Sequence, residues 1–113
     1  MHEYSIVQAL VERVEREAHA RRAAAVHRLS IRIGELAGVD VGLLMTAFAT
    51  FRDRTICEGA ELAVESVPAR WECPRCHGEV GAGSLLRCVR CDEPARLASG
   101  DEIVLDRIEM EVP

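Results

Sequence analysis

Residues 26–33 read VHRLSIRI, and this stretch decides the fold class because its side chains alternate between two faces. A period of two is typical of a β-strand that buries one face. The predicted core face carries four side chains: His27, Leu29, Ile31 and Ile33. The opposite face carries three: Arg28, Ser30 and Arg32. A half-buried strand of this kind requires other elements to cover its apolar face.

The segments on either side of this strand have the spacing of helices. Residues 5–20 place apolar side chains three and four positions apart, which predicts an amphipathic helix with a charged outer face. Residues 41–54 repeat this spacing and contain both phenylalanines. Asp40 immediately precedes them and is of a residue type that caps helix N-termini. Two helices are therefore expected to pack on the sheet.

Two more segments alternate and complete the sheet. Residues 60–67 and residues 102–112 predict a second and a third strand, in an antiparallel or mixed arrangement. Asp106 lies in the apolar phase of the last segment, which predicts either a β-bulge or a charged partner for its carboxylate. The expected fold class is α+β: two helices on a small three-stranded sheet, with an inserted zinc-ribbon-like knuckle.

The knuckle is predicted by two Cys-x-x-Cys pairs, Cys73 with Cys76 and Cys88 with Cys91. Each pair directs two sulfurs at one ion, and two pairs complete a tetrahedral site of four thiolates. Zinc is the expected occupant, and the alternatives are a rubredoxin-like iron centre, disulfides or a redox dithiol. Four protein ligands leave no open position for a substrate, so this zinc is expected to be structural.

Two residues near this pattern are of metal-binding types but are interpreted otherwise. His77 follows the first pair directly, and we expect an exposed loop histidine rather than a replacement ligand. Cys57 lies outside both pairs, and we expect a small buried thiol rather than a metal or redox site.

Length and charge limit the classes of function. The chain has 113 residues, enough for one small domain with a satellite, and its net charge of -5 disfavours nucleic acid as a partner. No apolar run is long enough for a membrane span, and the first residues lack the basic and apolar regions of a signal peptide. The protein is therefore expected to be cytoplasmic, with neither a membrane nor a nucleic acid as partner.

The first three residues, Met1, His2 and Glu3, form a second candidate metal site. An α-amine, the next amide nitrogen and a histidine at the second position can close fused chelate rings around one metal. Nitrogen donors in a plane suit Ni(II) or Cu(II). The alternative is an exposed histidine beside a glutamate that interacts favourably with the helix macrodipole.

These features together resemble a known family. The motifs are MHEYSIVQALVE at the start, RLSIRIGELAGVD at 28–40, EGAELAVESVPARWEC at 58–73, the two Cys-x-x-Cys pairs and GDEIVLDRIEMEV at 100–112. The sequence resembles the HypA family, also called HybF, of hydrogenase nickel-incorporation proteins. The resemblance runs nearly from end to end and is specific because the Met-His-Glu start and the paired cysteines occur together.

The resemblance implies a metallochaperone that delivers Ni(II), as a transient cargo, during maturation of [NiFe] hydrogenase. It implies the GTPase HypB and the hydrogenase large subunit as partners. It also implies nickel binding at Met1, His2 and the backbone nitrogen of Glu3, with Asp40 as a neighbour. The implied zinc ligands are four: Cys73, Cys76, Cys88 and Cys91.

The sequence thus predicts two domains and one leading function. Residues 1–67, completed by the strand at 101–113, form the expected nickel-binding α+β domain, and residues 68–100 form the expected zinc-binding domain. A zinc-ribbon protein with a regulatory or nucleic-acid-associated role is the alternative. An enzyme is not expected, because no nucleophile with a nearby base, phosphate-binding glycine motif or open metal site is visible. A homodimer is compatible with the sequence.

Overall fold

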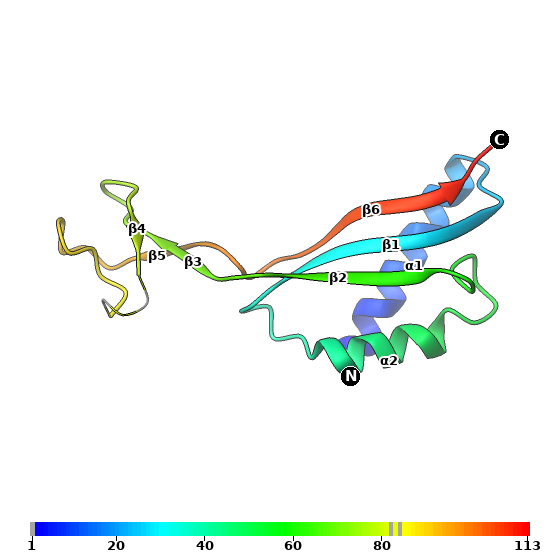
Figure 1. The fold of residues 1–113 in the computed structure, drawn as a ribbon, viewed down its shortest axis with the longest axis horizontal. Coiled ribbons are helices and arrows are strands. Elements are labelled where there is room, and N and C mark those ends of the chain that lie inside the picture. The colour runs from blue at the N-terminus through cyan, green and yellow to red at the C-terminus, as the bar shows by residue number, and fades with distance from the viewer. Residues whose placement is uncertain (1, 82, 84) are drawn as a thin grey trace. The chain divides into compact units, whose positions relative to one another are not determined.

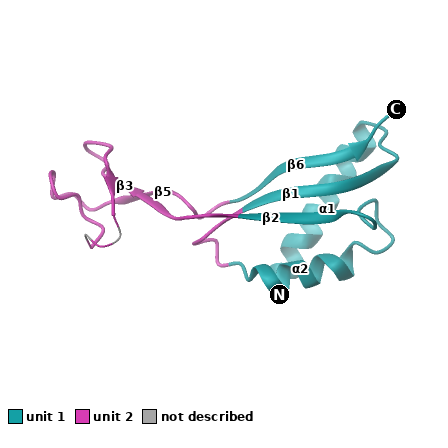
Figure 2. Cartoon of the chain, viewed as in Figure 1, with its two compact units in different colours: residues 1–32, 39–65, 103–113 teal, residues 33–38, 66–102 magenta. Residues whose placement is uncertain are grey.

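The computed structural model describes residues 2–81, 83 and 85–113, and the chain forms two compact units (Figures 1 and 2). Unit 1 comprises residues 1–32, 39–65 and 103–113. Unit 2 comprises residues 33–38 and 66–102. In both units, segments that lie far apart in the sequence meet in one compact body.

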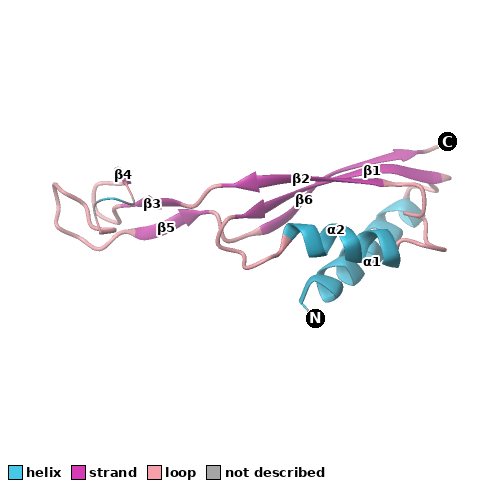
Figure 3. Ribbon diagram, turned by 60° about the horizontal axis from the view of Figure 1, so that its bottom comes forward, coloured by secondary structure: helices cyan, strands magenta, loops and turns pink. Residues whose placement is uncertain are grey.

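Unit 1 has the two-layer α+β fold that the sequence predicts. Its elements in chain order are α1 (His2–Ala20), β1 (Ala25–Gly34), α2 (Val41–Phe51), β2 (Glu61–Val67) and β6 (Ile103–Glu111). The strands form one sheet in the order β2-β1-β6, and both helices lie on the same side of it (Figure 3). Within the described residues, no helix is both long and apolar enough to cross a membrane.

The core of unit 1 follows the predicted apolar stripes. α1 buries residues spaced by four, three and four positions: Val7, Val11, Val14 and Ala18. α2 buries Leu44, Ala47 and Phe48. The sheet contributes Leu29, Ile31 and Leu62. Each fully buried valine or leucine of this kind stabilises the fold by about 1.5–3 kcal/mol, so unit 1 has an apolar core of its own.

The start of β1 differs from the predicted alternation. Val26 is buried, whereas His27, which we expected on the core face, is exposed. The His27 imidazole instead lies 3.4 Å from the carboxylate of Glu111 at the end of β6. The alternation is regular only from Leu29 onward, because burial favours the apolar valine over the polar imidazole at the first core position.

Asp106 has a charged partner, one of the two outcomes expected for it. Its carboxylate lies 3.2 Å from the guanidinium of Arg32, and Glu109 lies 3.9 Å from Arg28. Two arginines of β1, Arg28 and Arg32, thus have acidic partners in β6.

Unit 2 contains a small sheet that the sequence analysis did not predict. Its strands are β3 (Arg70–Glu72), β4 (Glu79–Val80) and β5 (Arg96–Ser99), in the antiparallel order β4-β3-β5. The buried cluster under this sheet is formed largely by cysteines: Cys73, Val80 and Cys88, with Trp71, Cys91 and Ala95 packed against it. So small an apolar cluster needs a further cross-link to hold its shape.

Three backbone segments of unit 2 approach one another closely at Gly34 and Gly100. The amide of Leu36 donates to the carbonyl of Gly100 at 2.7 Å. A Cβ on Gly34 would lie 2.2 Å from that carbonyl, and a Cβ on Gly100 would lie 2.5 Å from the Cα of Ala69. Gly100 also has a φ of +109°. Only glycine permits this close crossing of chains.

Candidate metal centre

The two Cys-x-x-Cys turns bring four sulfurs together in unit 2. The Sγ atoms of Cys73, Cys76, Cys88 and Cys91, called here the four-sulfur cluster, all lie within 4.8 Å of one another. The Sγ atoms of Cys76 and Cys88 are 3.8 Å apart. Tetrahedral zinc with Zn–S bonds of about 2.3 Å has sulfur–sulfur edges of about 3.8 Å, so the donor set and its spacing fit one zinc ion.

A repeated backbone conformation produces this convergence. In each turn, the first cysteine makes two backbone hydrogen bonds. Its amide donates to the carbonyl of the fifth residue after it, and its carbonyl accepts from the amide of the fourth residue after it. The bonds run from Cys73 to Gly78, His77 to Cys73, Cys88 to Glu93 and Asp92 to Cys88, each with an N···O distance of 2.9 Å. His77 and Asp92 both adopt positive φ, 61° and 51°, which turns the chain back sharply after each pair.

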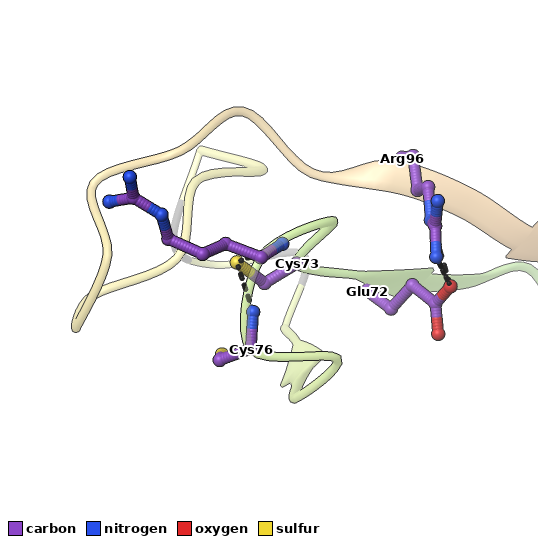
Figure 4. A network of polar contacts seen from close by, with 5 residues as sticks. Glu72, Cys73, Cys76 and Arg96 are labelled. Carbon is purple, nitrogen blue, oxygen red and sulfur yellow. Dashed lines mark hydrogen bonds and ion pairs between the residues drawn. The ribbon is translucent and has the colours of Figure 1, made fainter.

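Backbone amides also point at the sulfurs. The Sγ of Cys73 accepts from the amides of Arg75 and Cys76 at 3.4 and 3.5 Å (Figure 4). Amides of Cys91 and Arg90 lower the pKa of Cys88 to about 7, and the amide of Gly78 lowers the pKa of Cys76. These hydrogen bonds favour the thiolate, which is the form that binds a metal.

The pKa of the Cys91 thiol, in contrast, is raised. Burial, followed by the neighbouring sulfurs of Cys76 and Cys73, raises the pKa of Cys91 to about 12. Four thiolates this close repel one another, so a divalent cation among them is what allows all four to ionise. All five cysteines of the chain are free thiols in the structure. The arrangement of the four-sulfur cluster is therefore one that can hold a metal ion.

An ion pair supports the strand that leads into the cluster. Glu72, the last residue of β3, lies 2.8 Å from the guanidinium of Arg96, the first residue of β5 (Figure 4). The pair joins the two strands directly before Cys73. The pair could not be predicted from local sequence, because the two residues are 24 positions apart.

The first turn of α1 lies beside the start of α2 within unit 1. The Glu3 carboxylate is buried and accepts from the backbone amide of Asp40 at 3.1 Å. The Asp40 side chain in turn accepts from the amide of Leu43 at 3.0 Å and caps α2. A capping box normally takes its carboxylate from the third position of the same helix, but here α1 supplies it. His2 is exposed, and Met1 lies outside the described residues.

Hydrogen bonds account for the charge state of Glu3. The amide of Asp40, and then the amide of Glu3 itself, lower the pKa of the Glu3 carboxyl below its ordinary value. The carboxylate is therefore ionised and engaged as an acceptor. The structure thus brings Glu3 and Asp40 together, although no sequence pattern predicts a bond across 37 positions.

The other two candidate residues lie as the sequence predicts. His77 is exposed in the first turn. Cys57 is fully buried in unit 1, and burial raises the pKa of its thiol to about 11. It is not part of the four-sulfur cluster.

Comparison with known proteins gives one consistent family. Residues 1–110 match the model of the HypA family, described as hydrogenase/urease nickel incorporation metallochaperones. The hydrogenase maturation factor HypA of Shewanella baltica is 39% identical over 113 residues, covering 98% of this chain and 97% of the relative. The corresponding factor of Wolinella succinogenes is 37% identical over 117 residues, covering 98% and 96%.

Two solved structures are similar over nearly the full chain. The solution structure of the Ni metallochaperone HypA from Helicobacter pylori has a TM-score of 0.75 and 29% identity, with 98% of each chain covered. A second solution structure of a HypA protein has a TM-score of 0.80 and 31% identity, covering 97% of this chain and 96% of that one.

Proposed function

Because the chain belongs to the HypA family of hydrogenase/urease nickel-incorporation metallochaperones, we propose that it binds Ni(II) at its N-terminus and delivers it for the maturation of [NiFe] hydrogenase. The observation that carries this proposal is the joint presence of the Met-His-Glu start and the four-sulfur cluster in a member of this family. In the proposed division, residues 1–67 with 101–113 carry nickel and residues 68–100 carry zinc.

The proposed nickel ligands are the α-amine of Met1, the imidazole of His2 and the amide nitrogens of His2 and Glu3. α1 begins at His2, and the first amides of a helix have no carbonyl partner within the helix. The metal can therefore replace the protons of these amides, which pass to the solvent, without breaking a helical hydrogen bond. A planar set of nitrogen donors suits Ni(II).

The Glu3 carboxylate supports ligation through the backbone nitrogen of that residue. It already accepts from the Asp40 amide, so it is engaged in joining α1 to α2. Nickel at the Glu3 nitrogen displaces the proton that this amide shares with the carboxylate, while the bond from Asp40 remains. In this proposal Asp40 is a neighbour that fixes the first turn of α1, and the helix cap on its side chain stays intact.

The proposed role of zinc is structural. Cys73, Cys76, Cys88 and Cys91 would hold it, and the ion would supply the cross-link that the small apolar cluster of unit 2 requires. The proposed partners in nickel transfer are the GTPase HypB and the hydrogenase large subunit. A terminal chelate suits a carrier, since ligands at the free end of a chain can be exchanged one at a time.

An extension of the N-terminus tests the nickel site. Two residues, Gly-Ser, added before Met1 remove the α-amine from its chelate ring while His2 stays in place. We expect the native chain to give the visible absorbance of planar, diamagnetic Ni(II), and the extended chain to lose both this absorbance and affinity. Identical spectra and affinities for the two forms would contradict terminal chelation.

His2→Ala is the matched control for the extension. It removes the imidazole but leaves the α-amine free, and we expect it to abolish specific Ni(II) binding with zinc content and melting temperature unchanged, because His2 is exposed. Binding by the native chain should weaken as the pH falls, because protons compete with the metal for the nitrogen ligands. A large fall in melting temperature in His2→Ala would show a structural role instead.

A further inference from the structure

The four cysteines of the cluster differ in exposure and in what covers them. Cys73 is fully buried, Cys88 is 7% exposed and Cys91 is half-buried, whereas Cys76 is exposed. We propose that Cys76 is the ligand at which the zinc centre reacts with electrophiles and releases its metal, and that Arg90 shields this sulfur. The inference rests on zinc occupancy, which belongs to the proposed function.

Arg90 reaches the exposed sulfur from the opposite turn. It occupies the third position of the second Cys-x-x-Cys pair, and its Nη2 lies 3.7 Å from the Sγ of Cys76. A Cβ on Gly78 would lie 2.9 Å from this Nη2 and 3.3 Å from the same Sγ. The absence of a side chain at Gly78 therefore leaves the space in which guanidinium and sulfur meet.

The repeated backbone of the two turns supplies an internal comparison. Arg75 occupies in the first turn the position that Arg90 occupies in the second. The amide of Arg75 donates to Cys73, but its side chain has no hydrogen bond or ion pair within the described part of the chain. The two arginines carry equal charge and sit at equivalent positions, but within the described residues only the Arg90 side chain has a hydrogen bond to a sulfur.

The contact changes the reactivity of a zinc thiolate in a defined direction. Four thiolates around Zn²⁺ leave a net charge of about −2, which keeps the sulfur lone pairs nucleophilic. A guanidinium that donates to one sulfur withdraws electron density from it and covers it sterically. Groups of this kind around a metal site change metal affinity by about 10- to 100-fold when removed.

The reaction that tests this is alkylation by iodoacetamide. The Cys76 sulfur forms a bond to the methylene carbon, the carbon–iodine bond breaks and iodide leaves. The thioether that results is no longer an anionic ligand, so zinc held by three thiolates passes to a chromogenic chelator in the solution. Zinc release follows the absorbance of the chelator, and mass spectrometry of early samples identifies the alkylated cysteine.

The full chain, loaded with zinc, is compared with three single variants and one double variant. We expect Cys76 to be alkylated first, and Arg90→Gln to release zinc about 10-fold faster than the parent. Arg75→Gln, the matched control, should change the rate less than about twofold. Gly78→Ala should resemble Arg90→Gln, because it fills the space of the guanidinium. The double variant, Gly78→Ala with Arg90→Gln, should release zinc no faster than either single variant. Both changes remove the same contact, that of Arg90 with Cys76.

Three results would overturn the inference. One is early alkylation at Cys73, Cys88 or Cys91, and another is equal acceleration by Arg75→Gln and Arg90→Gln, which would mean that charge alone matters. A third is additive acceleration in the double variant. If Arg90→Gln fails to retain zinc on purification, Arg90→Lys is measured instead and should be intermediate in rate. A parent chain that binds no zinc would contradict the proposed function. Any of the three results above, obtained with a zinc-loaded chain, would contradict only the inference about Cys76 and Arg90.

Discussion

Glu3 is a single residue that serves both its own helix and the next one. Its buried carboxylate replaces the acidic side chain that α2 lacks at its third position, where Leu43 stands. Because the amide of Asp40 is held by α1, the start of α2 cannot move independently of the first turn of α1. His2, which precedes Glu3 in the proposed nickel chelate, therefore lies next to the hydrogen bond that joins α1 to α2.

Glu3→Gln should lower stability in a pH-dependent way. The pKa of Glu3 is lowered in the folded chain, so its carboxylate stabilises the fold above the ordinary pKa and loses this effect as pH falls through the folded value. We expect a lower melting temperature for the variant at pH 7, and a difference that shrinks below about pH 4.3. Melting curves of the parent, Glu3→Gln and the exposed control Glu12→Gln at several pH values check this. A constant difference across the range would contradict it.

Cys57 is a buried thiol whose reactivity should depend on unfolding. It is fully buried, and burial raises its pKa to about 11, so little thiolate forms at neutral pH. We expect no labelling by a thiol reagent in the folded chain and complete labelling in denaturant. Cys57→Ser should cost about 1–3 kcal/mol, because it buries a hydroxyl, and Cys57→Ala should cost less. Labelling of Cys57 in the folded chain at neutral pH would contradict the assigned burial.

At the scale of elements, long periodic segments were predictable and short ones were not. α1, α2, β1 and β6 extend over nine or more residues, so a period of 3.6 or 2 is visible in them. β4 has two residues and β3 has three, which is too few to show any period. Their strand conformation comes from the cysteine turns that they flank, and so it depends on contacts beyond the local sequence.

The features of the candidate site also fall into two kinds: those set by local sequence, which could be predicted, and contacts between distant segments, which could not. The spacing within each Cys-x-x-Cys pair is local and already specifies the turn, so the four-sulfur cluster could be predicted. The contact of Arg90 with Cys76 and the bond between Glu3 and Asp40 join distant segments. His27 was assigned to the wrong face because the alternation is irregular between Val26 and Leu29, where the apolar valine takes the buried position.

The crossing of segments at Gly100 should be intolerant of any side chain. Gly100→Ala would place a Cβ 2.5 Å from the Cα of Ala69 at a φ of +109°, which L-residues rarely adopt. We expect a loss of about 2 kcal/mol or more in the free energy of unfolding. Gly81→Ala is the control in unit 2, since its added Cβ meets no atom of the described residues within 4 Å. Urea unfolding followed by Trp71 fluorescence measures both, and equal stabilities would contradict the crossing.

The whole molecule consists of two units that are stabilised by different means. Unit 1 has a core of aliphatic side chains and Phe48, and it holds both helices, α1 and α2. The buried cluster of unit 2 is built around Cys73, Val80 and Cys88. The single tryptophan, Trp71, lies in unit 2. Helical circular dichroism therefore reports on unit 1, and tryptophan fluorescence reports on unit 2.

Loss of zinc should separate these two signals. A strong chelator takes the proposed zinc ion from all four sulfurs, and Cys76→Ser leaves only three sulfurs to hold it. In both cases Trp71 loses the ordered cluster against which it packs. We expect a red shift of the fluorescence of Trp71 while the helical signal at 222 nm remains, because the valines of α1 and Phe48 of α2 are buried without any contribution from the metal. Cys57→Ala, which removes a cysteine from unit 1, is the control and should leave the fluorescence unchanged. A parallel loss of the helical signal and the native fluorescence would show that the zinc cluster and the α+β core unfold as one cooperative system.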